Sequence, residues 1–314
     1  MNEKQEKNKT KEVPIRKQLN VLYSLIVIFA IVVMSVTFSY SRYIPTWSEI
    51  GYQLFGVLPD ELNSNYVRFI DVGQGDSILI NSNGTTALID LGPETDDGEE
   101  LVKSLHKMGV YRIDSVIISH FDSDHIGGDA VLSRMKIGNI IMPEIDAENS
   151  SKSFEEYDFA TKLSGANIYL AQVGTEIKVG DFTLTIVAYY PDNEDSNDSS
   201  VMVMAEIENK SFLFTGDASK KIEERLLDDG YILDCDVFKV AHHGSRYSNS
   251  LDFLKAITPD YAVISCAKGN NYGHPHSEVI SNLNAINSQV FRTDIKGDIT
   301  FYIEDGKLKT ETEK

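Results

Sequence analysis

The sequence predicts an α/β sandwich preceded by one transmembrane helix, and three observations support this prediction. From residue 66 onward, short β-rich runs alternate with helical stretches, as in folds that pack helices on both sides of sheets. The chain has 314 residues, of which 42% are hydrophobic, enough to fill one large core. A continuous apolar run, residues 19–40, precedes these alternating elements.

The apolar run over residues 19–40 predicts the membrane segment. Its 22 residues carry no formal charge, and a helix of this length crosses a hydrocarbon layer of about 30 Å. A cleavable signal peptide is the alternative, but no small residues at a cleavage spacing follow the run. Basic residues gather in residues 1–18, and only Arg42 closely follows the run. We therefore expect residues 1–18 in the cytoplasm and the rest of the chain outside the cell.

After the membrane segment we expect a connector over residues 41–65, with a short amphipathic helix around residues 47–55. One domain then follows over residues 66–306, and a tail over 307–314.

The whole chain has a formal net charge of −19. Because the first 42 residues are basic, the exported part is more acidic still, and such a field repels polyanions unless metals or a basic patch reverse it. Two cysteines, Cys235 and Cys266, lie in apolar stretches and are interpreted as buried residues, with one disulfide as the alternative.

The elements of the domain follow from local composition. Strands are expected where β-branched and aromatic residues run between glycines and polar residues, and helices where apolar residues recur at helical spacing. The expected strands are residues 66–71, 77–81, 86–90, 115–119, 137–142, 168–171, 181–188, 201–207, 211–215, 237–241 and 261–265, with a closing pair at 289–292 and 298–304. The expected helices are residues 98–108, 128–135, 154–164, 220–229, 250–257 and 277–284. Residues 191–200 are polar and acidic, as in a loop.

The hexapeptide His120-Phe-Asp122-Ser-Asp124-His125 follows the apolar strand at 115–119. Alternate residues of an extended segment share a face, so a strand end aims His120, Asp122 and Asp124 in one direction. A tight turn into the next helix then brings His125 round. Imidazoles with carboxylates suit zinc or manganese and do not suit iron–sulfur clusters or copper(I). A solvated acidic turn is the alternative, disfavoured because similar residues recur downstream.

Further ligand types also lie at the ends of expected strands. Asp90 and Asp217 each end an apolar run, and His242 and His243 follow the run at 237–241. Core or solvated histidines would scatter along the chain, whereas only His106 lies in the middle of a helix. The histidines at strand-end loops are His120, His125, His242, His243, His274 and His276. This clustering predicts one site at one edge of the sandwich.

The order of these motifs resembles that of the metallo-β-lactamase fold superfamily, and within it the extracytoplasmic metallo-β-lactamase-like domain of ComEC competence proteins. The resemblance covers roughly residues 66–303 and implies an αββα sandwich. It does not imply DNA import, because the multi-helix channel of ComEC is missing from this chain. The matching motifs are Phe69-Ile-Asp-Val-Gly-Gln-Gly-Asp-Ser77, Ile118-Ser-His-Phe-Asp-Ser-Asp-His-Ile-Gly-Gly128, Asn197-Asp-Ser-Ser-Val201, Phe214-Thr-Gly-Asp217, Lys239-Val-Ala-His-His-Gly-Ser245, Asn271-Tyr-Gly-His-Pro-His276 and Arg292-Thr-Asp294.

The resemblance implies two divalent metal ions, Zn²⁺ or Mn²⁺. His120 and Asp122 would hold one ion, and Asp124 with His125 the other. Asp217 would bridge the two ions. The second ion would also take His243, with His242 as the less favoured candidate, and Asp90 would orient a ligand. Because Asp122 replaces a histidine of the general superfamily, the first ion has oxygen-rich ligands, which makes manganese a rival to zinc.

The same resemblance assigns roles in catalysis and substrate binding. Asp124 and His274 are the expected catalytic residues. His274 would stabilise a substrate oxygen or protonate the leaving group, and a purely structural turn histidine is the alternative. The residues expected to bind substrate are Gln74, Asp76, Asn197 and Ser200. The glycines beside Gln74 and Asp76 serve a tight loop equally well.

The function expected from these residues is that of a membrane-anchored, extracytoplasmic hydrolase with two metal ions, acting on phosphodiesters and most simply as a phosphodiesterase or nuclease. One alternative is a cell-envelope esterase for phosphocholine or teichoic-acid groups, which the acidity of the exported part favours mildly. Hydrolysis of β-lactams or lactones ranks lower. A non-catalytic, metal-binding sensor module is the alternative from a different class.

Overall fold

The computed structural model describes residues 15–39, 64–95, 98–144, 151–191, 193, 195–231 and 233–314. The chain divides into two compact units, Met1–Ile44 and Pro45–Lys314. The first unit contains helix α1 (Ile15–Ser39), whose described side chains are all exposed. The expected amphipathic helix around residues 47–55 lies outside the described residues.

The membrane prediction is not supported by the structure. Within the described parts of the chain, no helix is both long enough and apolar enough to span a membrane.

The second unit contains two β-sheets. The first has eight strands in the order β15-β14-β1-β2-β3-β4-β5-β6, and the second has seven in the order β13-β12-β11-β10-β9-β8-β7. The strands of the first sheet are β1 (Asn65–Phe69), β2 (Ile78–Ser82), β3 (Thr85–Ile89), β4 (Arg112–Ile117), β5 (Lys136–Met142), β6 (Asn167–Leu170), β14 (Ile299–Glu304) and β15 (Lys307–Thr312). Those of the second are β7 (Glu176–Val179), β8 (Phe182–Ala188), β9 (Met202–Ile207), β10 (Lys210–Phe214), β11 (Val237–Lys239), β12 (Tyr261–Ile264) and β13 (Gln289–Arg292).

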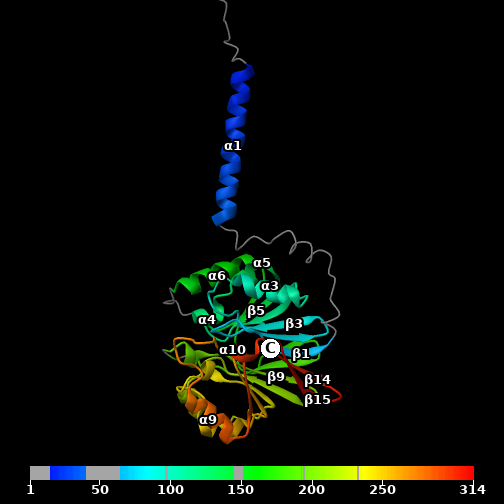
Figure 1. Ribbon diagram of the computed structural model, residues 1–314, viewed down its shortest axis with the longest axis vertical. Helices are drawn as coiled ribbons and strands as arrows, with labels where there is room; N and C mark the ends of the chain where they lie inside the picture. The colour runs from blue at the N-terminus through cyan, green and yellow to red at the C-terminus, as the bar shows by residue number, and fades with distance from the viewer. Residues whose placement is uncertain are drawn as a thin grey trace, which may run out of the picture. The chain divides into compact units, whose positions relative to one another are not determined.

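Helices lie on the outer faces of both sheets, which gives an αββα sandwich and confirms the predicted fold class (Figure 1). The helices along the first sheet are α3 (Glu99–Lys107), α5 (Ala130–Arg134) and α6 (Lys152–Ser164). The helices that pack on the second sheet are α7 (Lys220–Asp228), α8 (Leu251–Ile257) and α9 (Ser277–Ala285). Two short helices, α4 (Ser123–Ile126) and α10 (Thr293–Lys296), interrupt connections.

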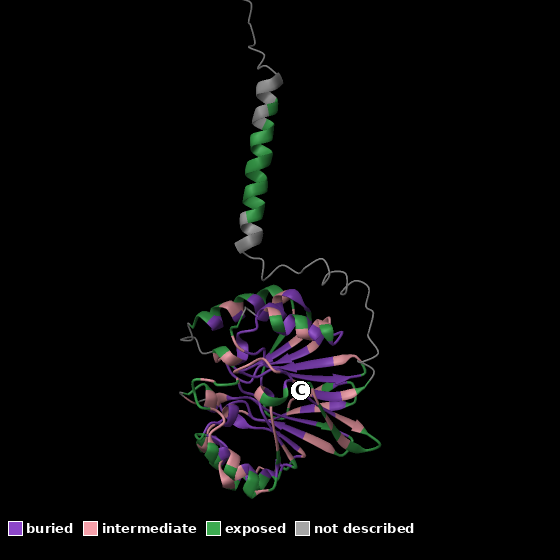
Figure 2. Ribbon diagram, viewed as in Figure 1, coloured by how far each residue is buried: buried purple, intermediate pink, exposed green. Residues whose placement is uncertain are grey.

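The main core lies between the two sheets, where Figure 2 shows the strands as buried. Strand β8 alternates buried and half-buried residues, because successive side chains of a strand point to opposite faces. In this layer Phe301 packs against Phe69 and Phe212, with ring centroids 6.0 and 6.3 Å from its own. A second apolar cluster joins the outer face of the seven-stranded sheet to α7, α8 and α9. Cys235 and Cys266 are buried free thiols, as interpreted from their apolar surroundings.

The C-terminal region differs from the prediction. Residues 289–292 and 298–304 do not pair with each other, because α10 carries the chain from the edge of one sheet to the other. Strand β14 pairs instead with β1 and with β15, so residues 307–314 are not a tail. Asp305 and Gly306 both have positive φ, 53° and 69°, the backbone of a two-residue hairpin turn.

Candidate metal centre

The predicted ligands come from loops at the same edge of the two sheets. Strand β4 leads into the loop that contains the hexapeptide, and α4 turns the chain so that His125 is buried. Asp217 follows β10, and His243 follows β11, its parallel neighbour. Because parallel strands end at one edge of a sheet, residues far apart in sequence meet there.

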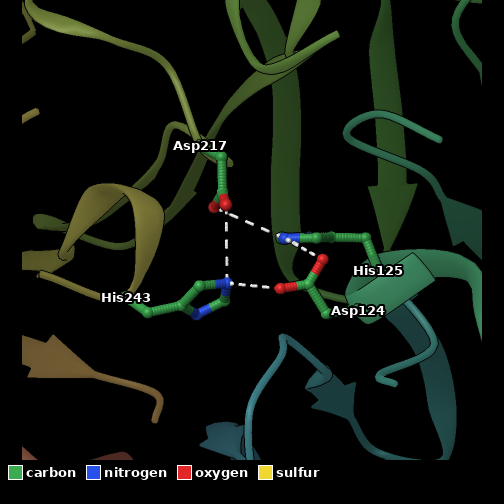
Figure 3. A group of neighbouring side chains, drawn as sticks. All are labelled: Asp124, His125, Asp217 and His243. Atoms are coloured by element: carbon green, nitrogen blue, oxygen red, sulfur yellow. Dashed lines mark ion pairs between the residues drawn. The ribbon is translucent and has the colours of Figure 1, made fainter. Parts of the chain in front are cut away.

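Four of the predicted ligands form one cluster, Asp124, His125, Asp217 and His243 (Figure 3). Asp217 lies between the two imidazoles, 3.4 Å from Nε2 of His125 and 3.4 Å from Nε2 of His243. Oδ2 of Asp124 lies 3.2 Å from Nε2 of His243, and Oδ1 lies 4.0 Å from Nε2 of His125. One atom from each of the four residues lies within 4.8 Å of the others.

The atoms that face the centre of this cluster have no other partner. Nε2 of His125, Nε2 of His243 and Oδ1 of Asp217 are buried without a hydrogen bond to any described residue. Each buried polar atom that lacks a hydrogen bond lowers the free energy of unfolding by roughly 1–3 kcal/mol. A divalent cation bound by these nitrogens and oxygens satisfies all of them, and the mixture suits Zn²⁺ or Mn²⁺. The residues therefore fit a metal site.

The electrostatics of the cluster also suit a cation. Burial alone would raise the pKa of Asp217, but the imidazoles of His243 and His125 hold it well below its usual value. Burial alone would lower the pKa of His243, but Asp217 and Asp76 raise it to about 10. Asp217 is therefore ionised, and it draws positive charge, as protons or as a metal ion, to the imidazoles.

Neighbouring groups hold the cluster in place. Asp90 accepts hydrogen bonds from the backbone N–H and the hydroxyl of Ser119, both at 2.7 Å, and its Oδ2 lies 2.8 Å from Nδ1 of His125. A carboxylate behind a ligating imidazole fixes its tautomer and orientation, the role expected for Asp90. The hydroxyl of Ser200 accepts from the backbone N–H of Asp217 at 3.1 Å and so positions the loop of that ligand.

The turn after β11 places its two histidines differently. Both have left-handed backbone angles, with φ of 50° at His242 and 53° at His243, which strains residues other than glycine. Asn249 holds this turn by accepting from the N–H of Ala241 at 3.0 Å and donating to its carbonyl at 2.9 Å. His243 is buried in the cluster, whereas the side chain of His242 is 29% exposed.

The residues predicted for the other metal ion lie beside the cluster. Nε2 of His120 is buried without a partner in the described part of the chain, 3.8 Å from Oδ2 of Asp122. The Asp122 side chain is 40% exposed and accepts a hydrogen bond from the hydroxyl of Ser196 at 2.5 Å. The ring of His120 lies 4.1 Å from that of His125, centroid to centroid. A second ion held by His120 and Asp122 stays a prediction.

A pocket of about 510 Å³ opens onto the cluster. His274 lines it, and burial, together with the nearby His243 and His242, lowers the pKa of His274 to about 4. Its imidazole is therefore neutral at neutral pH. The pocket is lined by Gln74, Phe121, Asp122, Ser123, Asp124, Ser151, Ser153, Ser196, Asp217, His242, His243, Tyr272 and His274.

Three predicted substrate-binding residues do not line this pocket. Asp76 is 1% exposed and forms an ion pair with Lys239, so its prediction as a substrate contact is wrong. Ser200 is fully buried and contacts Asp217 instead. Asn197 packs beside the pocket, where its amide donates to Asp195 at 3.0 Å. Only Gln74 of the four lines the pocket, and its Oε1 accepts from the N–H of Ala267 at 3.3 Å.

The sequence analysis missed several residues that line or support the site. Phe121 and Tyr272 add aromatic walls to the pocket, and no pattern of spacing marks them. Lys239 could have been recognised from the sequence, because it lies inside the apolar run 237–241. A lysine in such a run is rarely buried unless it is paired with an acidic residue.

The comparisons with known proteins agree with this architecture. Residues 70–268 match the family model of the metallo-beta-lactamase superfamily. The protein YhfI of Bacillus subtilis, described as a metallo-beta-lactamase fold protein, has a TM-score of 0.52 and 13% identity, over 79% of this chain and 100% of that chain. CmlA of Streptomyces venezuelae, a diiron beta-hydroxylase, has a TM-score of 0.52 and 12% identity over 77% of this chain and 54% of that one. At this identity the likeness concerns the fold.

Curated relatives include competence proteins. ComE operon protein 3 of Bacillus subtilis is 28% identical over 79% of this chain and 34% of its own length. Competence protein ComA of Neisseria gonorrhoeae is 30% identical over 79% of this chain and 34% of its own length. The chain thus spans about a third of these relatives. It belongs to the metallo-beta-lactamase superfamily of metal-dependent hydrolases and is related to the ComEC-family competence proteins.

Proposed function

We propose that the protein is a metal-dependent hydrolase of phosphodiesters. The observation that carries the proposal is the cluster of Asp124, His125, Asp217 and His243, whose unpartnered atoms face one point at the base of an accessible pocket. A divalent cation in such a site supplies Lewis-acid activation of water and of a phosphoryl oxygen. The carboxylates of Asp124 and Asp217 add oxygen ligands, which suit the hard cations that bind phosphate.

The residues around the cluster have roles of their own in this proposal. His274 lines the pocket next to the cluster with a neutral imidazole. A neutral imidazole donates one N–H, which can stabilise negative charge on a substrate oxygen. Protonation of the leaving group by an imidazolium is less favourable at neutral pH, because the lowered pKa of His274 keeps the ring uncharged. Phe121 and Tyr272 line the same pocket and offer aromatic surface against which a substrate can pack.

The names of the relatives, which are competence proteins, support a nucleic acid as substrate. The pocket favours a second candidate. Among its described lining residues there is no Lys or Arg to bind the further phosphates of a long polyanion. The chain as a whole is also acidic, at −19. A small or zwitterionic phosphodiester, such as a phosphocholine or teichoic-acid group of the cell envelope, avoids this repulsion.

The proposed location rests on the sequence alone. We propose that residues 19–40 anchor the protein in the membrane with the N-terminus in the cytoplasm and the catalytic domain outside, because the charge before this segment is positive. Protease added to intact cells should then remove the domain. Complete protection until the membrane is opened would contradict this orientation.

A substrate panel tests the activity. The full-length protein, supplied with Mn²⁺ or Zn²⁺, is assayed with bis(p-nitrophenyl) phosphate, single-stranded DNA and a phosphocholine ester. Turnover of the first compound supports a phosphodiesterase, and the other two distinguish the candidate substrates. Bound metal without turnover of any of the three would instead favour a non-catalytic metal-binding module.

A further inference from the structure

A buried ion pair lies directly behind the metal cluster. Nζ of Lys239 is 2.6 Å from Oδ2 of Asp76, and the two side chains are 1% and 2% exposed. Desolvation of two charges offsets most of their attraction, so a buried pair is often no more stabilising than apolar residues of similar volume. Stability alone is therefore a weak reason for this pair.

The second oxygen of Asp76 faces a metal ligand. Oδ1 of Asp76 lies 3.6 Å from Nδ1 of His243 and has no hydrogen-bond partner among the described residues. The same ring nitrogen lies 3.0 Å from the carbonyl oxygen of Ser265, to which it donates as an N–H. The opposite nitrogen of His243 is thereby directed at Asp124 and Asp217.

The lysine also contacts the backbone that leads to this ligand. Nζ of Lys239 donates to the carbonyl of Val240 at 3.0 Å, immediately before the turn in which His243 has a φ of 53°. The Asp76 backbone N–H donates to the carbonyl of Asp124 at 3.2 Å. The pair thus ties the loop of residues 73–77 to the two loops that hold Asp124 and His243.

We propose that Asp76 and Lys239 are positioning residues for the metal site. The Asp76 carboxylate acts on the imidazole of His243 from behind through its charge, at 3.6 Å and without the hydrogen bond that Asp90 makes to His125. The Lys239 ammonium neutralises Asp76 and holds the turn. Asp90 also differs because hydrogen bonds from Ser119 and the contact with His125 stabilise its carboxylate, with no lysine beside it in the described contacts. The proposal rests on the metal site of the proposed function.

The test separates positioning from a contribution to stability alone. The test compares four full-length proteins: wild type, Asp76→Asn, Lys239→Met and the double variant. Calorimetric titration with Mn²⁺ gives the Kd of each, and thermal unfolding without metal gives the Tm. Lys239→Met leaves a buried carboxylate without its cation, so we expect its Tm to fall by roughly 10 °C. The double variant removes both charges and should recover most of that Tm.

Metal affinity should not recover in the double variant. We expect the Kd for Mn²⁺ to rise about 10–100-fold in Asp76→Asn and to stay raised in the double variant, as for other residues that orient ligands. A double variant that regains the wild-type Kd together with its Tm would overturn the proposal, as would an unchanged Kd in all three variants. Wild type that binds neither Mn²⁺ nor Zn²⁺ would instead overturn the metal site itself.

A matched control comes from the other end of β11, the strand that ends in Lys239. Lys210 and Asp236 form an ion pair of 2.7 Å between the starts of β10 and β11, away from the cluster, with side chains 20% and 18% exposed. Lys210→Met should lower the Tm without changing the Kd for Mn²⁺. An equal rise in Kd in this control would contradict a specific role for Asp76 and Lys239.

Discussion

Oδ2 of Asp90 lies 2.8 Å from Nδ1 of His125, and the opposite nitrogen of that ring faces Asp217 at 3.4 Å. The carboxylate itself is held by two hydrogen bonds from Ser119. A buried imidazole with one nitrogen fixed in this way presents the other in a single direction, which is what a metal ligand requires. The candidate site therefore has two layers, the side chains that could bind a metal ion and the groups that orient them.

Replacement of Asp90 tests this second layer. Asp90→Asn should weaken Mn²⁺ binding by about 10–100-fold, because the amide no longer fixes the tautomer of His125. Asp114→Asn is the matched control, since Asp114 also accepts a backbone N–H, from Thr86 at 3.0 Å, but at the other end of β4. Titration with Mn²⁺ measures the effect, and equal affinities in the two variants would argue against an orienting role for Asp90.

Asp217→Ala should abolish turnover and reduce bound metal, because this carboxylate lies between His125 and His243. The exposed Asp228→Ala on α7 is the control and should retain both. Elemental analysis of the purified variants gives the metal content. An unchanged metal content in Asp217→Ala would refute the role of Asp217 as a shared ligand, although not the fold.

His274→Ala separates catalysis from scaffolding. If the imidazole stabilises a substrate oxygen, kcat should fall by about 10²–10³-fold, with bound metal and Tm nearly unchanged. His106→Ala, in α3 and away from the pocket, should leave kcat unchanged. A loss of bound metal in His274→Ala would mean that His274 is a metal ligand. A lower Tm with little change in kcat would mean that His274 only shapes the turn.

The lowered pKa of His274 also predicts a pH dependence of stability. Burial lowers this pKa from 6.5 to about 4, so between these values the unfolded chain binds more protons at this residue than the folded one. Its contribution to the unfolding free energy of the metal-free protein therefore rises with pH from about 4 to 6.5. Denaturation of wild type and His274→Gln across this range measures the difference, and parallel curves would contradict the shift.

Removal of residues 307–314 tests the corrected C-terminus. These residues include β15, which pairs with β14 over six positions and covers its edge. A truncated chain should therefore have a lower Tm, since a paired strand at the sheet edge is lost and Ile303 loses its partner Leu308. A Tm equal to that of the full chain would show that the strand adds nothing to stability.

Local patterns in the sequence predicted most elements of the domain. The expected strand at residues 289–292 is found with the same bounds as β13, and the helix expected at 154–164 is α6, Lys152–Ser164. Ligand types at strand ends were visible because apolar runs stop at charged or imidazole side chains. Strand β7 was missed because it has only four residues, two of them charged, which is too short a run for its alternation of polar and apolar residues to stand out.

Contacts between distant segments could not be predicted in the same way. Nothing local indicates that β13 and β14 enter different sheets, because that depends on tertiary pairing of β14 with β1. Asp76 looked like a substrate contact since it lies in a glycine-rich loop, and only the fold brings it 2.6 Å from Lys239, 163 residues later in the chain. The choice of His243 over His242 likewise depends on the left-handed turn.

Chelation and reconstitution test the central claim most directly. The full-length protein is treated with a chelator, assayed with bis(p-nitrophenyl) phosphate, and assayed again after Mn²⁺ or Zn²⁺ is returned, with Asp217→Ala in parallel. We predict that turnover disappears with the metal, returns with it in the wild type, and stays absent in the variant. Turnover that survives chelation, or metal-loaded wild type that hydrolyses no phosphodiester, would contradict a metal-dependent phosphodiesterase.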